Sequence, residues 1–182
     1  MSSVYVAMLR GINVGGHNKV PMKDLAAMFC DARCDKVQTY IQSGNVIFHA
    51  SPAASAKVPG AVTALIEQRL GLRVPVILRT LEQMTAVAAN NPFLAAGAPL
   101  EYQHVMFLTN VPTRQAIDLL DPQRSPPGQF QVRGQEIYLW LPNRVAGSKL
   151  TNAYFDSRLS TTSTQRNWQT VTKLLALMRG AA

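Results

Sequence analysis

The first half of the chain alternates short apolar segments with longer amphipathic ones. Short apolar segments predict four strands, at residues 4–9, 36–41, 46–49 and 74–78. Apolar side chains recur at helical spacing in residues 21–30, 62–70 and 81–89, which indicates three helices. Pro21 suits a first helical position, and Gly71 suits a helix end. The predicted order is therefore strand, helix, two strands, helix, strand, helix.

The second half repeats this order. Strands are predicted at residues 104–109, 130–133, 136–141 and 161–164, and helices at 116–120, 149–159 and 168–178. Thr113 and Ser148 are the expected caps of the first two helices. We expect an α+β fold of two ferredoxin-like (β-α-β-β-α-β) lobes with extra helices, derived from an internal duplication. The lobes span residues 1–92 and 101–182, and the polar, Pro- and Gly-bearing segment 93–100 connects them.

Two polar, glycine-bearing corners of the first lobe are expected to meet. In an antiparallel sheet of order 4-1-3-2, the loop after the first strand lies beside the turn between the second and third strands. Glycine-loop amides and basic side chains suit an anion, and side-chain amides can orient it. The alternative is that Asn and Gly only satisfy local backbone groups. The predicted site comprises Arg10, Asn13, Gly15, Gly16, His17, Asn18, Lys19, Gln42, Ser43 and Asn45.

The second lobe offers a smaller set of candidates. Lys149 and Arg166 each precede a predicted helix and could bind an anion there, together with Asn167. The alternative, which the sequence favours, is that Ser148 and Asn167 cap these helices.

Composition narrows the class of partner. The 182 residues are 47% hydrophobic, enough for a sizeable core, and 18 Lys and Arg against 10 Asp and Glu give a net charge of +8. This charge favours anionic partners. The sequence shows no apolar run of membrane-spanning length and no signal peptide, so we expect a cytoplasmic protein without a membrane partner. Cys30 and Cys34 are expected to be reduced thiols, and no metal or cofactor motif is present.

The leading hypothesis is a protein that binds a small anionic ligand, such as a phosphorylated small molecule or a nucleotide, at the two corners. One alternative is an enzyme acting on a small phosphorylated or nucleotide-like substrate there, with Ser43 and His17 as the available nucleophile and base. Another is RNA or single-stranded nucleic-acid binding on Tyr138 and Trp140, unless the first lobe covers that face. The last is a dimeric interaction protein. Whether the chain is an enzyme, and whether it is a monomer or a homodimer, stays open.

Several of these segments carry a family resemblance. Residues 5–16 (YVAMLRGINVGG), 18–22 (NKVPM) and 39–46 (TYIQSGNV) resemble the opening blocks of the bacterial domain of unknown function 1697 family. Residues 148–152 (SKLTN), 164–168 (TQRNW) and 170–175 (TVTKLL) resemble its C-terminal block. The sequence departs from the family at residues 32–34, where glycine and an aromatic residue are usual. The resemblance implies two ferredoxin-like lobes and no established activity.

Overall fold

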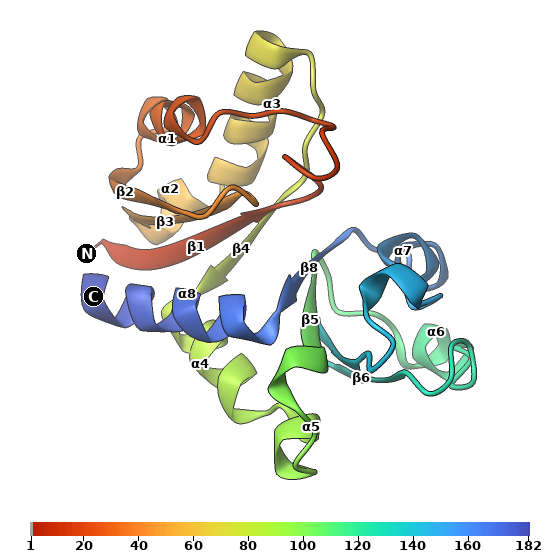
Figure 1. Ribbon diagram of the computed structural model, residues 1–182. Helices are drawn as coiled ribbons and strands as arrows, with labels where there is room; N and C mark the ends of the chain where they lie inside the picture. The colour runs from red at the N-terminus through yellow and green to blue at the C-terminus, as the bar shows by residue number, and fades with distance from the viewer. Residues whose placement is uncertain (1) are drawn as a thin grey trace. The chain divides into compact units, whose positions relative to one another are not determined.

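The computed structural model describes residues 2–182 (Figure 1). The chain forms two compact units: residues up to Thr85 together with Lys173–Ala182, and Ala86–Thr172. The boundaries of these units differ from those of the predicted lobes. Residues 86–100 group with the second unit, and the last ten residues group with the first. Each unit contains one four-stranded antiparallel sheet, so the fold is of the mixed α+β kind.

The first unit follows the predicted order of elements, with one short helix, α2, added between β3 and α3. Its strands pair in the order β2-β3-β1-β4, as the sequence predicted. Helix α4 is shared between the two units. The elements are β1 (Ser3–Leu9), α1 (Met22–Asp31), β2 (Asp35–Tyr40), β3 (Asn45–Ala50), α2 (Pro52–Ser55), α3 (Val58–Leu70), β4 (Val76–Thr80) and α4 (Leu81–Ala89).

Strand β1 lies at the centre of the first core. Every residue of it from Val4 to Leu9 is buried, as expected of a central strand that is covered on both faces. Helices α1 and α3 lie along one face of the sheet (Figure 1). There the ring of Phe48 on β3 packs against Phe29 of α1 and Tyr5 of β1, with ring centroids 5.4 and 5.6 Å apart. Helix α3 ends at Gly71, as predicted, and Gly71 adopts the left-handed backbone conformation.

The second unit repeats this plan. Its strands pair in the order β6-β7-β5-β8, and α6 and α7 cover one face of the sheet (Figure 1). The elements are α5 (Pro92–Ala95), η1 (Leu100–Tyr102), β5 (Gln103–Leu108), α6 (Arg114–Asp118), β6 (Gln129–Arg133), β7 (Glu136–Trp140), η2 (Val145–Gly147), α7 (Asn152–Leu159), β8 (Ser163–Asn167) and α8 (Trp168–Ala181), the last of which runs into the first unit.

Capping explains where the second-unit helices begin. The hydroxyl of Thr113 accepts a hydrogen bond from the Ala116 amide at 3.2 Å, so the predicted cap of α6 is confirmed. Helix α7 begins three residues later than predicted, because Thr151 caps it, with its hydroxyl 3.2 Å from the Tyr154 amide. Ser148 is therefore not the cap of α7. In residues 2–182, no helix is long and apolar enough to cross a membrane.

Candidate functional site

The two corners predicted to meet do meet. The side-chain amide of Asn13 donates a hydrogen bond to the carbonyl of Gln42 at 2.8 Å, and the amide of Leu9 donates to the carbonyl of Gly44 at 2.8 Å. The loop after β1 and the turn before β3 therefore share one edge of the first sheet, because β1 and β3 are central antiparallel neighbours.

The loop after β1 is a miniature hairpin. The amide of Asn13 donates to the carbonyl of Asn18 at 3.1 Å, and that of His17 donates to the carbonyl of Val14 at 3.0 Å. Gly15 and Gly16 form its tip with φ values of 57° and 80°, which a two-residue turn of this hand requires. The conformation of this turn is therefore enough to explain the presence of the two glycines.

The gap between the corners is filled from inside. The Asn13 side chain also donates to the Val20 carbonyl and accepts from the Val20 amide, both at 2.9 Å, so its amide is engaged on both sides. Ile12 is buried against Gly44: a side-chain carbon placed on Gly44 would lie 2.8 Å from Cδ1 of Ile12. Asn13 and Ile12 therefore stabilise the contact between the two corners and do not line an enclosed cavity.

The remaining predicted residues divide by exposure. Asn45 is fully buried, and its amide donates to the hydroxyl of Ser43 at 2.9 Å and to the Tyr40 carbonyl at 3.3 Å. His17, Asn18, Lys19 and Gln42 are exposed, and Arg10 is half-buried. The surface of the corners is therefore basic and open to solvent, while the amide of Asn45 serves the turn.

In the second unit, Asn167 and Arg166 make local hydrogen bonds. Asn167 caps α8, because its side-chain oxygen accepts from the Thr170 amide at 2.8 Å. Arg166 is buried, and its guanidinium donates to the Thr164 hydroxyl and the Gln165 carbonyl, both at 2.8 Å. Burial lowers the pKa of Arg166 to about 10. Lys149 is exposed.

The aromatic pair on β7 is not an open stacking surface. Tyr138 is 2% exposed, and its hydroxyl donates to the Val87 carbonyl at 3.0 Å. Burial raises the pKa of this phenol to about 12. Trp140 is half-buried, and within residues 2–182 its buried indole nitrogen has no hydrogen-bond partner. Nucleic-acid bases therefore cannot stack on Tyr138 in this structure.

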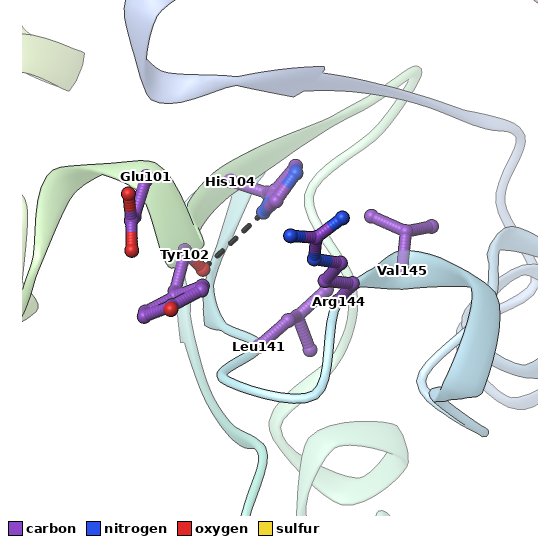
Figure 2. A pocket seen from close by; sticks show the side chains of 6 residues that line it. All are labelled: Glu101, Tyr102, His104, Leu141, Arg144 and Val145. Atoms are coloured by element: carbon purple, nitrogen blue, oxygen red, sulfur yellow. Dashed lines mark hydrogen bonds between the residues drawn. The ribbon is translucent and has the colours of Figure 1, made fainter.

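Sequence reasoning missed a pocket that lies wholly in the second unit. It has a volume of about 240 Å³ and lies where the start of β5 meets the segment after β7 (Figure 2). The segment before β5 contributes a carboxylate and a phenol, and β5 contributes an imidazole. The segment that follows β7 contributes a guanidinium and apolar side chains. Its lining residues are Glu101, Tyr102, His104, Leu141, Arg144 and Val145.

Arg144 occupies an unusual backbone conformation in this pocket. Its φ of 63° and ψ of 167° lie in a region that is essentially reserved for glycine. Holding a non-glycine residue there costs about 1–3 kcal/mol, and such residues cluster at ligand-binding sites. The Arg144 amide donates to the Leu141 carbonyl at 3.0 Å, which fixes the turn. This backbone conformation places a side chain with five N–H donors at the pocket wall.

His104 has one ring nitrogen engaged. Its Nδ1 lies 3.3 Å from the Tyr102 carbonyl (Figure 2). Because a carbonyl only accepts, we infer that Nδ1 carries the proton and that Nε2 is the basic nitrogen of the neutral ring. Burial lowers the pKa of His104 below its ordinary value, and the hydrogen bond to Tyr102 partly opposes this. The imidazole is therefore neutral at pH 7.

Glu101 and Tyr102 form the acidic side of the pocket. The pKa of the Tyr102 phenol is raised, first by its hydrogen bond to the Glu101 carboxylate and then by the charge of Glu101, while Arg144 lowers it. In Figure 2, Glu101 lies on one side of the pocket, and Arg144 lies with Val145 on the other. The pocket is therefore bipolar, with a guanidinium and a carboxylate in one small space.

The sequence signal for this pocket is weak and can be interpreted only once the fold is known. His104 begins a predicted strand, and Arg144 follows a predicted hairpin, but 40 positions separate them. Two further predictions, on metal binding and on the two cysteines, are separate from this pocket. Within residues 2–182, no group of three His, Cys, Asp or Glu side chains is arranged to hold a metal ion. Of the two free thiols, Cys30 is exposed and Cys34 is buried; burial, then Cys30 and Asp35, raises the pKa of Cys34 to about 11.

The two-sheet α+β architecture has a known relative. A conserved bacterial protein, SP0830 from Streptococcus pneumoniae, is similar in structure, with a TM-score of 0.72 and 21% sequence identity. The similarity covers 98% of this chain and 99% of that one. At this identity it shows the fold alone.

The family is established by sequence. A family model described as "Protein of unknown function (DUF1697)" matches residues 2–138, and the chain belongs to that family. The predicted corner residues and Glu101, Tyr102 and His104 lie inside the match, whereas Arg144 and the resembling C-terminal segments lie beyond it. No curated protein matches this chain.

Proposed function

We propose that the protein binds a small anionic ligand, and that the pocket lined by His104 and Arg144 holds it. The observation that carries this proposal is the backbone of Arg144, which is held in a region reserved for glycine while its side chain lines a pocket. A glycine at this position would remove the strain, so keeping arginine implies a use for its guanidinium.

The surroundings of Arg144 support an anion as its partner. Within residues 2–182 its guanidinium makes no ion pair, although Glu101 lines the same pocket. A planar guanidinium matches a carboxylate or phosphate through two parallel hydrogen bonds. The volume of about 240 Å³ corresponds to about eight water molecules, which is room for a small metabolite.

Substitution of Arg144 tests the proposal. We expect Arg144→Gly to abolish binding of small carboxylates and phosphates, measured by calorimetry, and to raise the free energy of unfolding by about 1 kcal/mol because the strain is relieved. Arg114→Gln is the matched control, because it removes an exposed arginine of the same unit outside the pocket. Undiminished binding to Arg144→Gly would contradict the proposal, and its higher stability rules out unfolding as the cause of a loss.

The corners of the first unit are a second candidate site. The Asn13–Gln42 hydrogen bond holds an exposed loop carrying His17 and Lys19 against the turn. A phosphorylated ligand or nucleotide bound here would contact this open basic surface, with Arg10 beside it. Lys19→Gln should then weaken binding while leaving thermal stability unchanged, because Lys19 is exposed. Enzymatic action at these corners has weaker support, since the Ser43 hydroxyl accepts from Asn45.

We also propose that the two units are ferredoxin-like lobes derived from one duplicated unit. Corresponding hydrogen bonds support this. Leu9 donates to the Gly44 carbonyl in the first unit, and Leu108 donates to the Gln135 carbonyl in the second, both at 2.8 Å. Both mark the end of the first strand of their sheet, next to the turn that precedes the third.

Two buried arginines extend the correspondence. Arg79 on β4 pairs with Val6, and Arg166 on β8 pairs with Val105. Each arginine is the fourth residue of its strand and is buried. A buried charge at the same register position of both sheets is costly, so its repetition favours common descent over coincidence. A self-comparison of family sequences should align residues 76–80 with 163–167 if the proposal holds.

A further inference from the structure

The polar groups of the second-unit pocket specify more than negative charge. Arg144 offers only donors. His104, neutral with its Nδ1 hydrogen directed to the Tyr102 carbonyl, offers the lone pair of Nε2. Within residues 2–182, Nε2 has no hydrogen-bond partner and is not fully enclosed. A ligand therefore meets a donor at Arg144 and an acceptor at His104.

Glu101 adds a second acceptor. It is exposed, and an ionised carboxylate can accept hydrogen bonds at both of its oxygens. Its charge opposes a second negative group on the ligand. Leu141 is buried and Val145 is 48% exposed, so the rest of the wall accepts a small apolar body.

Building on the proposed function, we propose that the ligand is a small hydroxycarboxylate or aminocarboxylate. Its carboxylate binds Arg144, and its hydroxyl or amino group donates a hydrogen bond to Nε2 of His104. The guanidinium of Arg144 and Nε2 of His104 then each have a complementary partner on the ligand.

A phosphate dianion fits the same groups less well. A second charge on the ligand requires a second cation, and His104 is the available candidate. Its imidazole would have to be protonated at Nε2 in a half-buried site with Glu101 in the same pocket. The other charged or titratable groups that line the pocket are Glu101, Tyr102 and Arg144, and the strand neighbours of His104, Leu139 and Asn167, carry none. Near pH 7 the pocket is thus suited to one negative group with a donor on the same molecule.

Two acids that differ by one hydroxyl provide the test. Calorimetry at pH 7.5 compares mandelate with phenylacetate, and phenylglycine replaces the hydroxyl with an amine. We expect mandelate or phenylglycine to bind about fivefold more tightly than phenylacetate, the effect of one hydrogen bond of about 1 kcal/mol. His104→Phe keeps a ring without nitrogen, and in this variant the preference should vanish. The preference should also vanish as the pH falls through the pKa of His104, because the lone pair is then protonated.

Nuclear magnetic resonance gives an independent sign. The chain has three histidines, so the His104 ring signal can be assigned by its loss in His104→Phe. A ligand that donates to Nε2 stabilises the neutral ring, so the pKa of His104 should be lower with mandelate bound than with phenylacetate bound, because the two carry the same carboxylate charge. Inorganic phosphate is the comparison.

The outcomes separate the two proposals. If phosphate binds more tightly than mandelate and raises the pKa of His104, or if mandelate and phenylacetate bind equally, the hydroxy- or aminocarboxylate assignment is overturned and anion binding by Arg144 stands. If none of the four probes binds, or if all of them bind Arg144→Gly as well as the natural protein, the proposed function itself fails.

Discussion

Substitution of Asn13 tests whether its side chain has a structural role in the glycine-bearing loop. Its side chain makes three hydrogen bonds, two with Val20 and one with the Gln42 carbonyl, at 2.8–2.9 Å. At about 1 kcal/mol net for each, but less for the exposed one, these contribute about 2–3 kcal/mol. Its φ of 56° costs a side chain such as alanine about 1 kcal/mol more. We therefore expect Asn13→Ala to lower the free energy of unfolding of the first unit by about 3–4 kcal/mol.

Two further variants separate these contributions. Asn13→Gly loses the same hydrogen bonds but adopts positive φ freely, so it should be about 1 kcal/mol less destabilising than Asn13→Ala. Asn18→Ala is the matched control in the same loop: Asn18 also has positive φ, but donates one exposed hydrogen bond, to the Gly11 carbonyl at 3.1 Å. It should cost about 2 kcal/mol or less.

Urea denaturation supplies the free energies. Native-state hydrogen exchange at the Leu9 amide reports the corner itself, because this amide is bonded to the Gly44 carbonyl beside the Asn13–Gln42 contact. Faster exchange at Leu9 is expected in Asn13→Ala and not in Asn18→Ala. A loss below about 1 kcal/mol in Asn13→Ala, or one equal to that in Asn18→Ala, would show that the Asn13 amide is not a structural tie.

Three shorter predictions follow from the same structure. Gly44→Ala should destabilise the first unit by about 2–4 kcal/mol in urea denaturation, since φ is +74° and the new carbon would lie 2.8 Å from Ile12 and Leu9; a neutral effect would mean that the corner relaxes easily. Tyr138→Phe should cost about 1–2 kcal/mol by leaving the Val87 carbonyl without its donor, and an unchanged denaturation midpoint would contradict that bond. A thiol reagent at pH 8 should label Cys30 quickly and Cys34 only on unfolding, because burial raises the pKa of Cys34 to about 11; equal labelling rates, read by mass spectrometry of peptides, would refute this.

The sequence by itself determined the order of the main strands and helices and the meeting of the two corners. Apolar periodicity located β1, α1 and β3 to within a residue or two, because each buries a continuous apolar face. The strand order then followed from the known chain path of such sheets, and adjacent central strands bring their ends together whatever the loop residues are.

The tertiary structure decided what fills those corners and where a pocket forms. A pattern of letters does not show that Ile12 turns inward against Gly44, since that depends on the exact backbone of a glycine loop. Nor does it show that Arg144 joins His104, because their meeting depends on the pairing of β5 with β7 and on a φ of 63° that no propensity predicts for arginine. Periodic burial is encoded locally, whereas a pocket is made by segments that only the folded chain brings together.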